Sequence, residues 1–237
     1  MDLIDAIYAR HSVRAYTGQT VGGAIRLQLE ALAQELSRAG GLTLSFRWDE
    51  PRAFSSPLAH YGKFSQVTNY LVISGRRRKG LEQDAGYYGE RIVLEAQRLG
   101  LNSCWVATTA KRRLVRASIP EGESLVILVA IGHGENAGVV RRSKVASQVS
   151  NVGADTPPWF ARAVEAALLA PTSINQQKFH LAFRAGDPGE LPGVRLTRRF
   201  GPYSSVDEGI VRLHVEIAAR DAAGLGPHEL PFHWIER

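Results

Sequence analysis

The sequence predicts an α+β fold in which a mixed, mainly antiparallel sheet is flanked by helices. Two observations lead to this prediction. Segments with helical periodicity alternate along the 237-residue chain with short apolar or alternating segments that are typical of strands. In addition, a helix, a strand and a long helix follow one another at similar spacing in both parts of the chain. We therefore expect two repeats, residues 1–150 and 151–237, intertwined as one globular unit.

The first repeat is expected to begin with a helix. Asp2 precedes an apolar stripe at helical spacing, and an acidic first turn favours the helix dipole. The further elements expected here are helices at 24–38, 81–99 and 110–117, and strands at 42–48, 69–74, 103–107 and 124–131. The apolar run 124–131 is short and bounded, which indicates a central strand. The polar stretch 134–155 is expected to form a loop.

The second repeat begins at Thr156 and Pro157, because proline at the first helical position loses no hydrogen bond. This helix is expected to run to about residue 170 and to be followed by a strand over 178–184. The capping box Ser205-x-x-Glu208 opens a long helix. A closing edge strand is expected within 231–236.

The similarity between the repeats is faint, and coincidence is the alternative to duplication. Asp207-x-Gly209 near the start of the last long helix repeats Asp84-x-Gly86 near the start of the first. Together with the shared order of elements, this pattern favours an internal duplication.

The composition is that of an ordinary globular protein, with 44% hydrophobic and 22% charged residues. No apolar run approaches the roughly 20 residues that cross a bilayer. Asp2 and Asp5 interrupt the pattern of a secretory signal, and a single cysteine excludes an internal disulfide framework. We therefore expect a cytoplasmic protein with no membrane partner.

The net charge is +6, and basic clusters occur at 76–79, 111–113 and 195–199. No helix-turn-helix, zinc-finger or aromatic RNA-binding pattern accompanies these clusters. We interpret them as a solvated surface that also attracts an anionic cofactor. Nucleic-acid binding is the alternative.

Two short segments far apart in the chain point to a phosphate-bearing cofactor. The first is R-x-S-x-R at Arg10, Ser12 and Arg14, where two planar guanidinium forks suit phosphate oxygens. If this segment is extended, alternation places both arginines on the same side. The second is A-P-T-S-I-N-Q-Q at 170–177, whose amides suit a heterocycle edge or a polyol. Together they indicate a flavin mononucleotide site, against the alternative of two ordinary helix ends.

These motifs resemble those of the FMN-dependent nitroreductase family, which opens with R-x-S-x-R and later carries A-P-S-x-x-N-x-Q-P-W. The stretch G-L-N-S-C-W-V at 100–106 is similar to the strand entry of that family. The stretch 131–135, followed by R-R-S-K at 141–144, is similar to its G-Y-P-x-E and K-R-K elements. Lys178 and Phe179 replace the usual Pro-Trp.

The resemblance implies an arrangement of the two repeats. Enzymes of this family are usually intertwined homodimers, in which one subunit supplies R-x-S-x-R and the other supplies A-P-S-x-x-N. Here the first repeat has R-x-S-x-R but has residues 39–46 where A-P-S is expected, whereas the second repeat has only the A-P-T-S-x-N motif. The chain therefore resembles a fused branch of the family, which implies a monomeric pseudo-dimer with one flavin site.

The resemblance also assigns cofactor-binding roles. Arg10, Ser12, Arg14, Arg141, Arg142 and Lys144 would anchor the FMN phosphate; Pro171, Thr172, Ser173, Asn175 and Gln177 would lie beside the ring and ribityl chain; Val106, Ala107 and Thr108 would face the flavin edge. No catalytic side chain is expected, because the cofactor carries the chemistry. No metal site is expected, since His228, Glu229 and His233 lack the spacing of a zinc helix.

The function that the resemblance implies is that of an FMN-dependent NAD(P)H oxidoreductase. NADH or NADPH would reduce the flavin, and a small electron acceptor such as a nitroaromatic compound or a quinone would then reoxidise it. The alternative is a degenerate protein of the same fold that binds flavin weakly or not at all. Ala107 and Thr108, where the family often has glycines, favour this alternative, whereas the intact R-x-S-x-R favours the enzyme.

Overall fold

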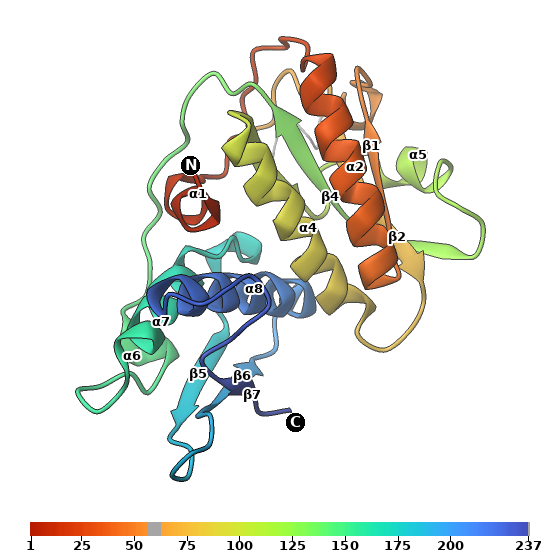
Figure 1. Cartoon of the computed structure of the whole chain (residues 1–237). Helices are drawn as coiled ribbons and strands as arrows, with labels where there is room; N and C mark the ends of the chain where they lie inside the picture. Colours follow the sequence, from red (N-terminus) through yellow and green to blue (C-terminus); the bar gives the residue numbers. More distant parts are fainter. Residues whose placement is uncertain (56–62, 237) are drawn as a thin grey trace.

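The computed structural model describes residues 1–55 and 63–236, and these residues form two β-sheets with helices between and around them (Figure 1). The first sheet contains β1 (Thr43–Arg47), β2 (Tyr70–Arg76), β4 (Glu123–Gly132) and β3 (Asn102–Val106), in that spatial order and antiparallel throughout. The second contains β5 (Phe179–Arg184), β6 (Gly193–Arg198) and β7 (His233–Trp234). The α+β class is confirmed, but the described strands form two sheets rather than one.

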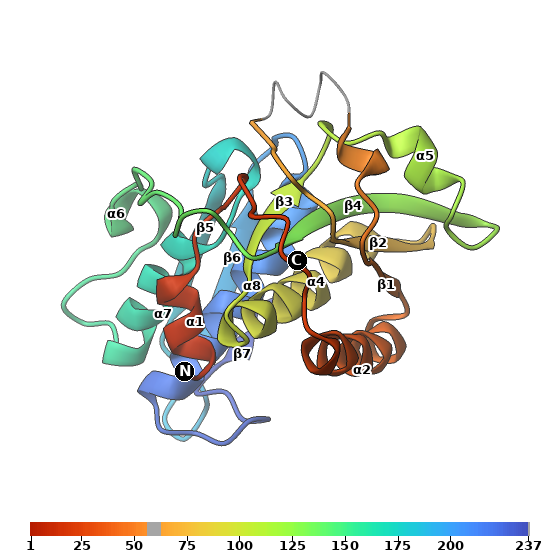
Figure 2. The same ribbon diagram turned by 90° about the horizontal axis from the view of Figure 1, so that it is seen from above.

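The described helices are α1 (Leu3–Ala9), α2 (Gly23–Gly40), α4 (Leu81–Arg98), α5 (Arg112–Arg116), α6 (Ala146–Val149), α7 (Pro158–Leu169) and α8 (Ser204–Ala222), with short 3₁₀ turns η1 (Arg52–Phe54) and η2 (Ser173–Asn175). Figure 2 shows α2 and α4 on one face of the four-stranded sheet. Helices α7 and α8 pack on each other beside the three-stranded sheet. No described helix is both long and apolar enough to cross a membrane.

Strand β4 is the centre of the first sheet, as its apolar sequence predicted. It lies between β2 and β3, and its residues from Leu125 to Gly132 are buried. A strand that is buried on both faces loses the alternation of an exposed strand, which explains why this segment is apolar without interruption.

The two longest helices, α4 and α8, cross where each carries a glycine. A Cβ atom on Gly86 would lie 2.0 Å from the carbonyl oxygen of Val206, and one on Gly209 would lie 1.9 Å from the carbonyl oxygen of Gln83. Gln83, which faces Gly209, lies three positions before Gly86, and Val206, which faces Gly86, lies three positions before Gly209. The contact between the two helices is therefore reciprocal. The helices could not approach this closely with any larger residue at either position.

Candidate functional site

A cavity of about 650 Å³ lies where segments from the two predicted repeats meet; we call it the junction cavity. The first repeat supplies the segment after α1, the end of β3 with the loop that follows, and residues 139–141. The second supplies residues 171–175 and the start of α8. The two motifs that suggested a cofactor site therefore face the same cavity, although some 160 residues separate them.

The structure divides the predicted site residues into two groups. Those that line the junction cavity are Ser12, Arg14, Val106, Ala107, Thr108, Arg141, Pro171, Thr172, Ser173 and Asn175. Those that do not line it are Arg10, Arg142, Lys144 and Gln177. Binding itself stays a prediction for both groups.

Arg10 lies behind the cavity rather than in its wall. Its residue is 3% exposed, and its Nε lies 3.8 Å from Oε1 of Glu90 on α4. The Nε and Nη1 atoms have no hydrogen-bond partner among the described residues. Glu90 also accepts a hydrogen bond of 2.8 Å from the indole of Trp105, which lines the cavity.

Positive charge is concentrated where Arg14 and Arg141 line the cavity, near the buried Arg10. The half-buried guanidinium of Arg141 donates to the carbonyl oxygens of Leu169 and Ala170. Burial, and then the nearby charge of Arg10, lower the pKa of Arg141 to about 10. Neither Arg14 nor Arg141 forms an ion pair with a carboxylate in the part of the chain that the structure describes. This end of the cavity can therefore accept an anion.

The loop from Thr172 to Gln177 has a strained backbone. Ile174, Asn175 and Gln177 have φ values of 46°, 55° and 43°, a region that residues with a Cβ seldom adopt. Asn175 Nδ2 donates to the carbonyl oxygen of Arg142 at 2.7 Å. Its other amide atom, Oδ1, is buried without a hydrogen-bond partner among the described residues. Because Asn175 lines the cavity, a ligand bound there can supply the donor that this acceptor lacks.

Asp207, near the start of α8, holds this loop in place. Its Oδ1 accepts from the backbone N–H of Ser173 at 2.9 Å, and its Oδ2 accepts from Nε2 of Gln176 at 2.7 Å. Burial raises the pKa of Asp207 to about 6, and these two hydrogen bonds oppose the rise. Sequence reasoning missed this residue as part of the site, although Asp207-x-Gly209 had drawn attention as a repeat.

Gln177 and Lys144 join two loops beside the cavity. The Gln177 amide donates to the carbonyl oxygen of Leu168 at 2.9 Å and accepts from the backbone N–H of Lys144 at 2.8 Å. The Lys144 ammonium donates to the carbonyl oxygen of Gln177 at 2.7 Å. Both side chains thus support the loops that carry Arg141 and Asn175.

The outer rim of the cavity is apolar and exposed. Val139 and Val140 are 82% and 81% exposed, and Ile174 is 86% exposed. All three line the cavity. With cations at one end, polar groups in the wall and apolar side chains at the rim, the cavity suits a flat ring that carries a phosphate.

Comparisons with known proteins identify the family and the fold of the chain. A family model described as "Putative TM nitroreductase" matches residues 2–219. The structure of a "putative nitroreductase" from Thermotoga maritima is similar to the chain, with a TM-score of 0.67, 19% identity, and coverage of 96% of this chain and 88% of that one. No curated protein sequence matches.

Two shorter solved structures cover about two thirds of this chain. A "putative nitroreductase" from Desulfovibrio desulfuricans, solved in complex with FMN, has a TM-score of 0.51 and 22% identity, over 66% of this chain and 98% of that one. A "putative NADH oxidase" from Clostridium acetobutylicum has a TM-score of 0.50 and 20% identity, over 65% and 100%. At these identities the likeness establishes the fold, and the family model confirms the family that the motifs predicted.

Proposed function

The chain belongs to the nitroreductase family whose model spans residues 2–219, and we propose that it is an FMN-dependent NAD(P)H oxidoreductase that reduces nitroaromatic compounds, quinones or similar small acceptors. The observation that carries this proposal is that buried polar atoms at the junction cavity lack hydrogen-bond partners within the described part of the chain. Asn175 lines the cavity, and its buried Oδ1 has no hydrogen-bond partner among the described residues; nor have Nε and Nη1 of the buried Arg10.

The charged end of the cavity fits a phosphate. Ser12, Arg14 and Arg141 would hold the phosphate, and Arg10 would act from behind them through its charge. Burial, and then the charge of Arg10, lower the pKa of Arg141, and a dianion here would offset the second effect. Charge-assisted hydrogen bonds from arginine to phosphate are stronger than those between neutral groups.

The rest of the cavity wall fits a ligand that has a flat ring and carries hydroxyl and amide hydrogen-bond donors. Asn175 Oδ1 would accept from such a donor, and Pro171 to Ser173 would shape the pocket beside the ring. FMN, when bound, supplies the hydride and electron chemistry. The chain itself binds and orients the cofactor, and the exposed Val139, Val140 and Ile174 offer an apolar surface to an incoming acceptor.

The reciprocal helix crossing supports a fused pseudo-dimer. In a twofold interface, residue i of one subunit contacts j of the other and j contacts i. The pairs Gly86 with Val206 and Gly209 with Gln83 follow this rule within one chain. We therefore propose residues 1–150 and 151–237 as the two halves, and a monomer of 25.9 kDa with one flavin.

A symmetric pseudo-dimer would have two equivalent flavin sites, and the two proposed halves differ at the second of these positions. Asp84 occupies in α4 the position that Asp207 occupies in α8, but it pairs with Arg78 at 2.6 Å instead of holding a loop. Arg78 also donates to the carbonyl oxygen of Gly40 at the end of α2 at 2.6 Å. An arginine thus takes the place that the Ser173–Gln176 loop has in the other half, which supports a single site.

The visible absorption spectrum of the purified protein, recorded after addition of FMN and desalting, tests this function. One retained flavin per chain that NAD(P)H bleaches without oxygen, and that a quinone or nitroaromatic compound restores, is the expected result. A colourless protein that cannot hold FMN would instead support the degenerate, non-enzymatic alternative. The side chains of Ala107 and Thr108, which line the cavity where the family often has glycines, favour that alternative.

A further inference from the structure

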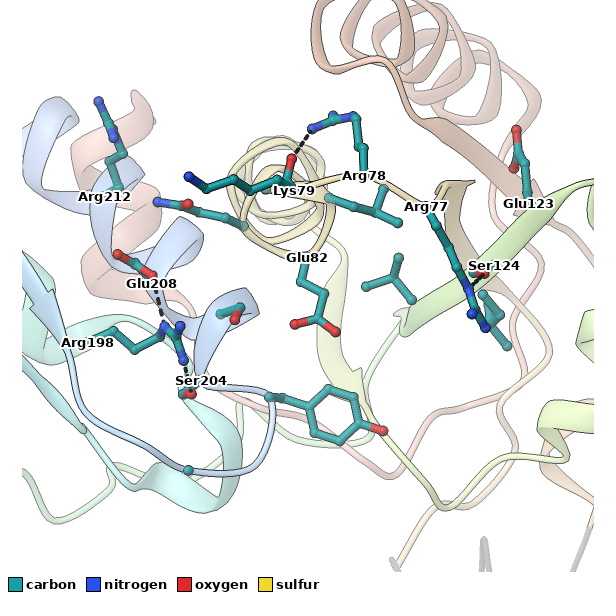
Figure 3. A pocket seen from close by; sticks show the side chains of 18 of the residues that line it. Arg77, Arg78, Lys79, Glu82, Glu123, Ser124, Arg198, Ser204, Glu208 and Arg212 are labelled. Atoms are coloured by element: carbon teal, nitrogen blue, oxygen red, sulfur yellow. Dashed lines mark hydrogen bonds and ion pairs between the residues drawn. The ribbon is translucent and has the colours of Figure 1, made fainter. Parts of the chain in front are cut away.

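A second and larger cavity, of about 1580 Å³, lies outside the junction cavity (Figure 3). The three basic clusters of the sequence meet at its wall, although they are far apart in the chain. The connection from β2 to α4 supplies Arg77, Arg78 and Lys79, α5 supplies Arg112 and Arg116, and β6 supplies Arg198. We call this space the basic cavity. Basic residues that merely keep a surface solvated would not have to gather at one cavity.

Several of these cations have no carboxylate partner in the described part of the chain. Arg77 donates to the hydroxyl of Ser124 at 3.0 Å, and Arg112 donates to carbonyl oxygens of the backbone. Lys79 and Arg116 are exposed and form no ion pair with a described residue. Burial, with the charge of Arg116 adding to it, lowers the pKa of Arg112. The cavity therefore has positive charge available for an anion.

The same cavity also offers groups that suit a sugar and a base. Figure 3 shows the Glu82 carboxylate projecting from the start of α4 into the middle of the space. A carboxylate in such a position accepts hydrogen bonds from ribose hydroxyls. Phe200 lines the cavity with its side chain 90% exposed, so its ring is free to stack on a flat base.

The two cavities are neighbours, because Tyr203 lines both of them. Its hydroxyl donates to the carbonyl oxygen of Ala107 at 3.4 Å, and Arg112 donates to the same oxygen at 2.8 Å. A single side chain and one strand end thus separate the basic cavity from the site proposed for the flavin. A ligand that extends past Tyr203 would therefore reach both cavities.

We propose that the basic cavity binds the adenosine diphosphate end of the dinucleotide co-substrate, while its nicotinamide passes Tyr203 to reach the junction cavity. Lys79, Arg77 and Arg116 hold the phosphates, Glu82 holds a ribose and Phe200 stacks on the base. This inference rests on the proposed function. A nucleic-acid strand fits less well, because Glu82, Glu121 and Glu123 interrupt the positive surface of the cavity.

ADP-ribose is the probe for this proposal, because it carries the adenosine diphosphate end without a nicotinamide. Calorimetric titration into the FMN-loaded full chain should show binding that weakens as salt rises. The double variant Lys79→Ala/Arg116→Ala should weaken binding by about tenfold or more, since it removes two charge-assisted contacts. The matched control is Arg76→Ala/Arg113→Ala, which removes the same charge from exposed positions outside the cavity and should change binding less than about twofold.

Steady-state kinetics give a second readout. The Lys79→Ala/Arg116→Ala variant should raise the KM for NAD(P)H by about tenfold while kcat and flavin content stay unchanged, because the removed contacts are remote from the flavin. Phe200→Ala should raise KM in the same way. Equal weakening in the control variant, or tighter binding of a single-stranded oligonucleotide than of ADP-ribose at this cavity, would overturn the proposal.

The outcomes also separate the two proposals. FMN-loaded protein that turns over NAD(P)H but binds no ADP-ribose would refute the basic cavity as a subsite and leave the oxidoreductase intact. A chain that cannot retain FMN, yet binds ADP-ribose through Lys79 and Arg116, would support the nucleotide cavity and refute the oxidoreductase.

Discussion

The imidazole of His214 on α8 lies 3.0 Å from the carboxylate of Glu90 on α4, measured from Nε2 to Oε1, and both side chains are completely buried. The other ring nitrogen of His214 lies 2.9 Å from the carbonyl oxygen of Ala166 on α7. Glu90 also faces Arg10 and accepts from Trp105. One buried carboxylate therefore links the two long helices to the N-terminal motif and to the wall of the junction cavity.

Replacing Glu90 should reveal this linkage. In Glu90→Gln the buried guanidinium of Arg10 loses its only described counter-charge, and we expect the free energy of unfolding to fall by about 3 kcal/mol. Denaturant unfolding measures this change. Glu121→Gln, at an exposed position, is the control and should stay within about 0.5 kcal/mol of the parent. Equal effects in the two variants would show that Glu90 does not stabilise the core.

The helix crossing predicts opposite effects of alanine at two helical glycines. A Cβ on Gly209 would meet the backbone of Gln83, which cannot yield without moving α4, so Gly209→Ala should destabilise by about 2 to 3 kcal/mol or more. Gly23, at the start of α2, has open space around its Cβ position, so Gly23→Ala should be neutral or stabilise by up to about 1 kcal/mol. Thermal and denaturant unfolding would check both.

Reciprocity adds a sharper expectation for the double variant. Gly86→Ala and Gly209→Ala act on one shared helix separation, so their effects should be non-additive, with the second substitution costing less than the first. Simple additivity would mean that the two contacts relax independently.

The raised pKa of Asp207 predicts a pH-dependent stability. Its pKa is about 6 in the folded protein against 3.8 for the free side chain, so the folded state binds more protons between these values. The free energy of unfolding should therefore fall as pH rises from about 4 to 7, by at most about 3 kcal/mol from this group. Unfolding titrations of the parent and of Asp207→Asn, compared across this range, measure the contribution. An identical slope in both proteins would contradict it.

The sequence was sufficient to predict the long apolar and amphipathic elements, because burial of one face determines their pattern. Strand β6 was missed, since its arginines were interpreted as part of a surface cluster. In the structure Val194 and Leu196 are buried, whereas Arg195 is half-buried and Thr197 is exposed, so the cluster conceals an alternating strand. Helix α6 was also missed, because four residues carry no periodic signal.

The candidate site was predictable only in part. The motifs predicted that Ser12, Arg14 and the loop 171–175 belong to one site, and in the structure they line one cavity. Arg10 differs, because the alternation argument placed it beside Arg14, whereas the structure buries it against Glu90. Its partner lies 80 positions away, and such long-range pairing leaves no local trace in the sequence. The same limit applies to Asp207, whose role depends on contacts with a loop from another part of the fold.

Arg14 and Arg142 distinguish a phosphate site predicted from the structure from one predicted from the motifs alone. The motif assigns both arginines to the phosphate, but only Arg14 lines the junction cavity. Arg142 is exposed and contributes its backbone carbonyl, which accepts from Asn175. Arg14→Ala should weaken FMN binding by between about tenfold and about 100-fold, because it removes charge-assisted hydrogen bonds. Arg142→Ala should weaken binding by less than about twofold, because its side chain lies outside the cavity.

Quenching of flavin fluorescence during titration of the apoprotein gives both dissociation constants, and thermal unfolding shows whether each variant remains folded. Retained structure in Arg14→Ala is part of the expectation, because this arginine forms no ion pair with a described carboxylate that its loss would break. Full flavin occupancy in Arg14→Ala would refute the junction cavity as the cofactor site. Equal loss in both variants would instead mean that the side chains of Arg14 and Arg142 both contact the phosphate, as the motifs alone predicted.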